Sequence, residues 1–179
     1  NSATLSQIVK RETSRLNRLV SDFLTYARPG PGRFEPVELA PLFEELRALV
    51  KTDGSCAVEL DVDVPGCLCA LGNSDQLRQV FWNLVRNAAE SQPVDGVVRV
   101  RARVDTDFGG LEICIEDRGC GFEPEALERI YEPFFTTKPK GTGLGLATVQ
   151  RVVEAHGGRI ALASESGKGT TVRVFLPSA

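Results

Sequence analysis

The sequence predicts one α+β domain, a mixed β-sheet covered by helices on one face and preceded by one long helix. The first indication is size, because 179 residues with 42% hydrophobic content bury one good core but hardly a second one. The second is that strand-like segments are interspersed with helical ones and end in a pair of strands. Such an order favours a two-layer α/β sandwich.

The long helix is predicted over residues 1–28, because apolar residues recur at helical spacing from Leu5 to Leu24 with basic residues between them. Its apolar stripe suits either a helix docked on its own domain or one member of a helical bundle. Residues 29–36 hold three prolines and two glycines, which predicts a linker. The globular domain then covers residues 37–179.

The elements of this domain follow from apolar periodicity. Helices are expected at 39–51, 74–91, 124–130 and 144–156, and strands at 57–62, 68–71, 97–104, 111–116, 159–164 and 171–176. Asn73 and Gln76 form a capping-box-like entry to the second of these helices. Valine and arginine alternate in the strand 97–104, which predicts one solvent-facing side.

Composition narrows the class of function. A formal charge of −3 and a pI near 5.3 disfavour a nucleic-acid partner, since duplex binding needs clustered Lys and Arg. No apolar run approaches the ~20 residues of a membrane span, and five cysteines without scaffold spacing suit a reducing cytosol. Because the sequence starts without methionine, we expect a fragment, with any sensor or membrane anchor lying outside it.

One face of the predicted helix 74–91 is polar. Asn83, Asn87 and Glu90 lie there about one turn apart, while the apolar residues fall on another face. Amide oxygens are hard neutral ligands suited to Mg²⁺, which completes its shell with phosphate oxygens and water. Taken alone, a pair of solvated asparagines is the simpler interpretation.

Asp117 closes a predicted strand and is followed by Gly119 and Gly121, which let the backbone bend away and leave room for a flat ligand. A buried carboxylate that accepts a hydrogen bond can select the exocyclic amino group of adenine over the oxygen of guanine, because only the amino group donates. Alone, Asp-x-Gly-x-Gly is merely a turn.

The segment 141–146, Gly-Thr-Gly-Leu-Gly-Leu, is a glycine-rich entry to a helix. It is not a dinucleotide fingerprint, since its third glycine comes one residue early, and it lacks the Gly-Lys-Ser/Thr of a P-loop. Free N–H groups and the helix dipole can hold phosphate there. Between Gly121 and Gly141 the sequence suits a mobile lid, in which Lys138 either reaches the phosphates or is solvated.

Together these motifs resemble the N, G1 and G2 boxes of the ATP-binding domain of sensor histidine kinases, and residues 131–138 resemble the F box with a short, nitrogen-regulation-type lid. The resemblance runs from about Leu5 to Leu176 and implies the Bergerat ATP-binding fold, preceded by the second helix of a dimerisation domain. It implies that Asn87 holds Mg²⁺, that Asp117 reads adenine, and that Asn83, Asn87 and Lys138 serve catalysis. The nucleotide-binding residues that it implies are Asn87, Asp117, Gly119, Gly121, Phe135, Thr136, Lys138, Gly141, Thr142, Gly143, Leu144, Gly145 and Leu146.

The resemblance also indicates the reaction. Related ATPases such as gyrase B carry a glutamate where this chain has Asn83, and an amide is no general base at neutral pH, so phosphoryl transfer is favoured over hydrolysis. Glu90 departs from the basic residue that many histidine kinases have. His156, the single histidine, resembles a structural feature at a helix end, so the acceptor histidine is expected outside this sequence.

The partners implied for the intact protein are a histidine-bearing dimerisation helix, a second copy in a homodimer, and the receiver domain of a response regulator. The implied cofactors are ATP and Mg²⁺, and the implied location is cytoplasmic. Two alternatives stay open: a serine kinase of the anti-sigma-factor type, disfavoured by residues 1–28, and a non-catalytic module that regulates a partner through ATP occupancy.

Overall fold

The computed structural model describes residues 32–52, 58–93, 95–138 and 141–179, together with Thr13 and Val20. Thr13 and Val20 are both helical, as predicted for the N-terminal segment. The rest of that expected helix, and residues 29–31 of the expected linker, lie outside the described residues.

A five-stranded sheet forms the centre of the domain, in the order β2-β4-β5-β7-β6. Its strands are β2 (Val58–Asp63), β4 (Gly96–Asp105), β5 (Gly110–Asp117), β6 (Arg159–Glu165) and β7 (Gly169–Leu176). β2 runs parallel to β4, and the other neighbouring pairs are antiparallel. The predicted mixed sheet is therefore confirmed.

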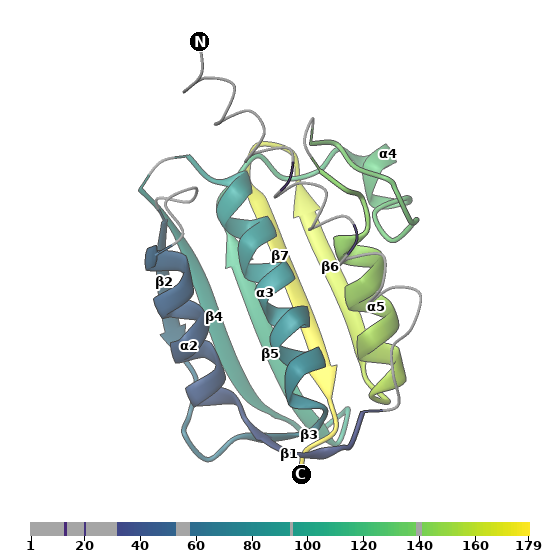
Figure 1. Ribbon diagram of the computed structural model, residues 1–179. Coiled ribbons are helices and arrows are strands. Elements are labelled where there is room, and N and C mark those ends of the chain that lie inside the picture. The colour runs from purple at the N-terminus through teal and green to yellow at the C-terminus, as the bar shows by residue number, and fades with distance from the viewer. Residues whose placement is uncertain (1–12, 14–19, 21–31, 53–57, 94, 139–140) are drawn as a thin grey trace.

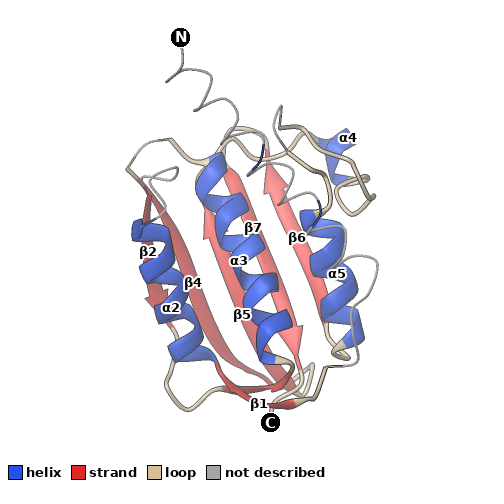
Figure 2. Cartoon of the chain, in the orientation of Figure 1, coloured by secondary structure: helices blue, strands red, loops and turns tan. Residues whose placement is uncertain are grey.

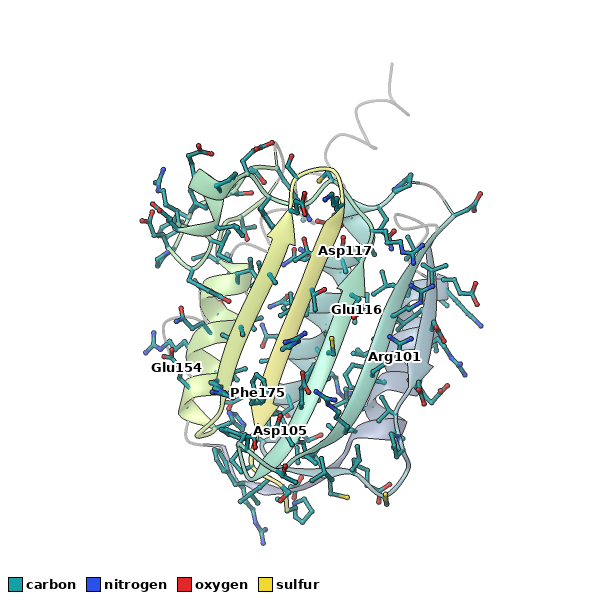
Figure 3. All side chains as sticks on the ribbon, turned by 180° about the vertical axis from the view of Figure 1, so that it is seen from behind. Arg101, Asp105, Glu116, Asp117, Glu154 and Phe175 are labelled. Carbon is teal, nitrogen blue, oxygen red and sulfur yellow. The ribbon has the colours of Figure 1, made fainter. Side chains whose placement is uncertain are left out.

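Three helices cover one face of this sheet: α2 (Leu39–Thr52), α3 (Ser74–Ser91) and α5 (Gly145–Ala155) (Figures 1 and 2). Between the two layers lies one apolar core, which includes Phe43 and Phe81 at 4.9 Å between ring centroids. On the opposite face, arginines of β4 pair with acids of β5, as in the 3.2 Å contact of Arg101 with Glu116 (Figure 3). The predicted solvent-facing side of the strand 97–104 is confirmed.

A small second sheet closes one end of the domain. β1 (Glu35–Glu38) pairs antiparallel with β3 (Cys69–Gly72). The sequence did not predict β1, and the last two residues of the expected linker, Glu35 and Pro36, belong to this strand. Pro36 fits because proline is accepted in an edge strand, where its missing N–H costs no ladder hydrogen bond.

Two helix predictions need correction at their ends. α4 spans only Pro124–Leu127 instead of reaching residue 130, and the chain then continues in turns. α5 begins at Gly145, with Leu144 as its N-cap residue, and ends at Ala155. The C-terminal ends of α3 and β5 and the N-terminal end of α5 all lie at the same end of the domain (Figure 1).

Candidate functional site

A cavity of about 260 Å³ opens at this end of the domain, beneath the segment that follows α4. Its lining joins residues far apart in the sequence. Of the predicted site residues, it includes Asn83, Asn87, Asp117, Gly121, Phe135, Thr136, Lys138, Gly141, Thr142, Gly143, Gly145 and Leu146. The four sequence motifs thus meet in one hollow.

Two predicted residues do not line the cavity. Gly119 is buried behind Asp117 and donates its N–H to that carboxylate at 2.8 Å. Leu144 is 1% exposed, because its side chain packs in the interior where α5 begins. Both residues therefore lie behind the cavity wall, and neighbouring residues form its lining.

Helix α3 presents its polar face to the cavity. Asn83 is 8% exposed and Asn87 is half-buried one turn later, while the apolar positions of α3 pack in the core. A Cβ built on Gly145 would lie 3.8 Å from the Asn87 amide nitrogen, so the start of α5 stands directly opposite Asn87. An amide oxygen and a helix N-terminus are thereby brought together, a donor set that fits Mg²⁺ and phosphate.

Asp117 ends β5 at the rim of the sheet (Figure 3). Its Oδ1 accepts hydrogen bonds from the Gly119 N–H at 2.8 Å and from the Ser91 hydroxyl at 3.0 Å. Burial raises the pKa of this carboxyl above its ordinary value, although these donors, the Thr170 N–H and the charge of Lys138 each act to lower it. A carboxylate kept in a poorly solvated cavity is typical of a ligand-binding position.

The glycine-rich loop is fitted closely against the segment after α4. Gly143 has φ of +69°, and a Cβ there would fall 2.3 Å from the carbonyl carbon of Phe134. The Phe134 N–H also donates to the Gly143 carbonyl oxygen at 2.9 Å. Only glycine allows this approach, which fixes the base of the lid-like segment to the entrance of α5.

Lys138 reaches from this segment to helix α3. Its ammonium group donates to Glu90 at 2.9 Å and to the Asn87 main-chain oxygen at 3.3 Å. Glu90 in turn contacts Arg86 at 3.2 Å. The lysine is therefore held over the cavity by a carboxylate rather than being fully solvated.

Several lining residues were not predicted as site residues. They include Ser91, Cys120, Phe122, Ile130 and Thr170. Ser91 lies one helical turn after Asn87, so periodicity alone could have placed it on the same face. Thr170 is opposite Asp117 in the β5–β7 ladder, and only the strand pairing reveals that proximity.

A second group of polar residues lies away from the cavity, where α3 begins and α5 ends. His156 is 2% exposed; its Nε2 accepts from the Asn73 N–H at 3.0 Å and its Nδ1 lies 2.7 Å from the Val152 carbonyl oxygen. The Phe34 ring stacks on the imidazole with centroids 4.6 Å apart. Gly157, at φ +71°, caps α5 as predicted.

Within the described ranges, no group of three or more His, Cys, Asp or Glu residues is arranged to hold a metal ion. Among the described helices, none has the length and hydropathy needed to cross a membrane.

Comparison with known proteins places the chain in a family. Residues 72–179 match the family of histidine kinase-, DNA gyrase B- and HSP90-like ATPases. That range covers α3, α5 and every residue that lines the cavity. The chain belongs to this family, and the predicted fold class is confirmed.

Individual relatives narrow the comparison. The sensor histidine kinase ZraS of Klebsiella oxytoca is 38% identical over 175 residues, which cover 97% of this chain and 38% of that protein. The crystal structure of full-length ShkA in complex with AMPPNP matches with a TM-score of 0.84 and 27% identity, over 99% of this chain and 39% of that one. The mycobacterial sensor histidine kinase MprB matches with a TM-score of 0.72 and 32% identity, over 82% and 98% of the two chains.

The chain thus spans less than two fifths of the length of ZraS. The predicted resemblance to sensor histidine kinases is confirmed at the level of family and relatives.

Proposed function

We propose that this chain binds Mg-ATP and, within the intact protein, transfers the γ-phosphoryl group to a histidine that lies outside this sequence. The observation that carries the proposal is the cavity, which gathers an amide pair on α3, a half-buried carboxylate on β5 and the N-terminus of α5. The AMPPNP bound in the ShkA structure supports a nucleotide as the ligand of this fold.

The residues of the cavity fit the parts of ATP. Asp117 accepts a hydrogen bond from the adenine amino group, because a carboxylate has lone pairs and no proton to donate. The main-chain N–H groups at the start of α5 face the phosphates, where the positive end of the helix dipole favours anions. Asn87 offers its amide oxygen to Mg²⁺, which when bound neutralises charge on the phosphate oxygens.

Lys138, in the segment that follows α4, supplies a positive charge to the cavity. In the free protein it is paired with Glu90 at 2.9 Å, so a triphosphate competes with this carboxylate for the ammonium group. Positioning and charge neutralisation account for most of the catalysis in phosphoryl transfer, and both come from groups already in place around the cavity.

The choice of acceptor follows from two side chains. Asn83, buried at the cavity wall, cannot take a proton from water, which disfavours hydrolysis. His156 is excluded as an acceptor in the same chain, because it is buried beyond the far end of α5, an 11-residue helix about 16 Å long. The acceptor imidazole must therefore come from another segment or another chain.

The proposed transfer breaks the bond between the γ-phosphorus and the β,γ-bridging oxygen and forms a phosphorus–nitrogen bond on the acceptor imidazole. ADP leaves with the bridging oxygen. The ring nitrogen that has a free lone pair attacks phosphorus, and the other ring nitrogen then releases its proton to solvent. In the intact protein, we propose, the acceptor lies on a dimerisation helix of a homodimer, and a response regulator receives the phosphoryl group.

A transfer assay tests the proposal. The chain is mixed with γ-labelled Mg-ATP and a polypeptide from the intact protein that carries the remaining dimerisation helix. We expect acid-labile label on the polypeptide, lost when the chain carries Asn87→Ala. Label released only as inorganic phosphate would indicate an ATPase, acid-stable label on a serine would indicate the serine kinase, and ATP binding without transfer would favour the regulatory module.

A further inference from the structure

Ser91, the last residue of α3, contacts the Asp117 loop at three points. Its hydroxyl donates to Asp117 Oδ1 at 3.0 Å, and its carbonyl oxygen accepts the Cys120 N–H at 3.1 Å. A Cβ on Gly119 would fall 2.2 Å from the Ser91 hydroxyl oxygen, so the loop can approach only because residue 119 is glycine. The contact therefore depends on the serine at the end of α3 and on the glycine in the loop after β5.

The Ser91 hydroxyl has one hydrogen and two acceptors within reach. It lies 2.8 Å from the Ala88 carbonyl oxygen and 3.0 Å from the Asp117 carboxylate. When Asp117 is ionised, the carboxylate is the stronger acceptor, because charge-assisted hydrogen bonds exceed neutral ones. The hydrogen then points at Asp117.

This arrangement fixes the orientation of the carboxylate. The terminal torsion of an aspartate is broad and two-fold, so an unrestrained carboxylate samples many directions. At Asp117 two donors, the Ser91 hydroxyl and the Gly119 N–H, converge on Oδ1. The lone pairs of Oδ2 consequently keep a defined direction at the cavity wall.

We propose that Ser91 is a positioning residue for base selection: its hydroxyl holds the Asp117 carboxylate in the direction that accepts the 6-amino group of a purine nucleotide. The inference rests on the proposed function, since it deepens the role of the same cavity. Ser91 acts through Asp117 and need not touch the nucleotide itself.

The test compares two nucleotides on two proteins by calorimetric titration in Mg²⁺. ATP carries the 6-amino group, and purine riboside triphosphate has hydrogen in its place. Ser91→Ala should weaken ATP binding about tenfold, the scale of one hydrogen bond to a charged group. The analogue should change by less than about twofold, because it makes no bond to Asp117.

Two further variants separate positioning from structural damage. Ser164→Ala removes a hydroxyl that accepts the Phe122 N–H at 2.9 Å and lies 3.0 Å from the Thr170 hydroxyl. Because this hydroxyl makes no direct bond to Asp117, its loss should not change the preference for ATP over the analogue. In an Asp117→Asn background, Ser91→Ala should have little further effect on ATP, since the two residues act as one unit.

The outcomes are distinct. An equal loss of affinity for both nucleotides in Ser91→Ala would make Ser91 merely structural, and an unchanged ATP affinity would also overturn the inference. If the folded wild-type chain binds neither nucleotide, the proposed function itself fails, and the inference falls with it.

Discussion

The two ends of helix α3 each carry an asparagine, and they differ in how far their polar groups are satisfied. At the start, Asn73 caps the helix by accepting the Gln76 N–H at 3.0 Å, and its own N–H bonds to His156. At the other end, Asn87 faces a cavity, and no described residue pairs with its side-chain amide. A satisfied polar cluster contributes to structure, whereas an open one is available to a ligand.

The two titratable residues of these clusters differ in the same way. His156 has a partner at each ring nitrogen and a stacked phenyl ring, so its environment is complete. Asp117 lies where burial raises the pKa of its carboxyl, so its charged form is disfavoured there. Such a cost to stability is expected where a function requires the charge.

The largest expected effect comes from replacing each of the two asparagines by alanine in turn. Asn87→Ala should weaken Mg-ATP binding about 100-fold, or about 3 kcal/mol, with little change in stability because the half-buried side chain pairs with no described residue. Asn73→Ala should cost about 1 kcal/mol of stability through the lost cap and leave the ATP affinity unchanged. Titration and urea unfolding of both variants measure this contrast. If the two variants weakened ATP binding equally, the distinction between a ligand-binding end and a structural end of α3 would be wrong.

Two glycines at the cavity end, Gly143 in the loop and Gly145 at the start of α5, separate the effect of backbone strain from the effect on ligand binding. Gly143→Ala should weaken ATP binding about tenfold or more and lower stability, since the positive φ and the contact with Phe134 cost roughly 1–3 kcal/mol. Gly145→Ala is the matched control: its Cβ meets only Asn87 at ordinary contact distance. Here we expect about fivefold weaker ATP binding, consistent with ~1 kcal/mol, and undiminished stability.

Removing the histidine tests the other end directly. His156→Ala leaves the Asn73 N–H and the Val152 carbonyl oxygen without their partner and opens a cavity beside Phe34. The free energy of unfolding should fall by about 2–4 kcal/mol, measured by urea denaturation. Below the unfolding range, ATP affinity and phosphoryl transfer should be unchanged. Loss of transfer in the folded variant would contradict a structural role.

Asp117→Asn should bind ATP poorly and yet be more stable than the wild type near pH 7. The folded-state pKa of Asp117 is raised above its model-peptide value of 3.8, so the folded protein holds the proton over a window in which the unfolded chain has lost it. The contribution of this group to stability is therefore full in acid and declines as pH rises through the folded pKa. Urea unfolding across pH should show that decline in the wild type and not in the variant.

The smallest effect is expected at the Lys138–Glu90 pair, whose side chains are 33% and 32% exposed. Lys138→Ala should weaken ATP binding about threefold and Glu90→Gln strengthen it about twofold, the range of partly solvated ion pairs. In the Lys138→Ala background the gain from Glu90→Gln should shrink, because no lysine is left to release. Glu45→Gln, which breaks the 2.8 Å pair with Arg78 at the other end of α3, is the control and should not affect ATP.

The fold was largely predictable because its signals are local. Alternating valines and arginines defined β4, and the Asn73–Gln76 capping pattern defined the start of α3. β1 was missed because four residues, one of them proline, carry too little periodicity to indicate a strand. α4 was predicted too long because the apolar residues that follow it pack in turns.

The cavity was predictable only motif by motif. Each motif alone had a simpler interpretation, such as solvated asparagines or a turn, and family resemblance was needed to join them. The contact between Ser91 and Asp117 could not be predicted, since it depends on how closely the loop lies against the end of α3. Thr170 and the Glu90–Lys138 pair depend on the same three-dimensional placement.

Titration of the folded chain with Mg-ATP and with Mg-GTP, in the wild type and in Asp117→Asn, tests the central claim most directly. If the open polar end is a site for adenine nucleotide, the wild type binds ATP at least about 30-fold more tightly than GTP, a gap of about 2 kcal/mol, and the variant loses that preference. A folded wild type that binds neither nucleotide, or binds both equally, would contradict it.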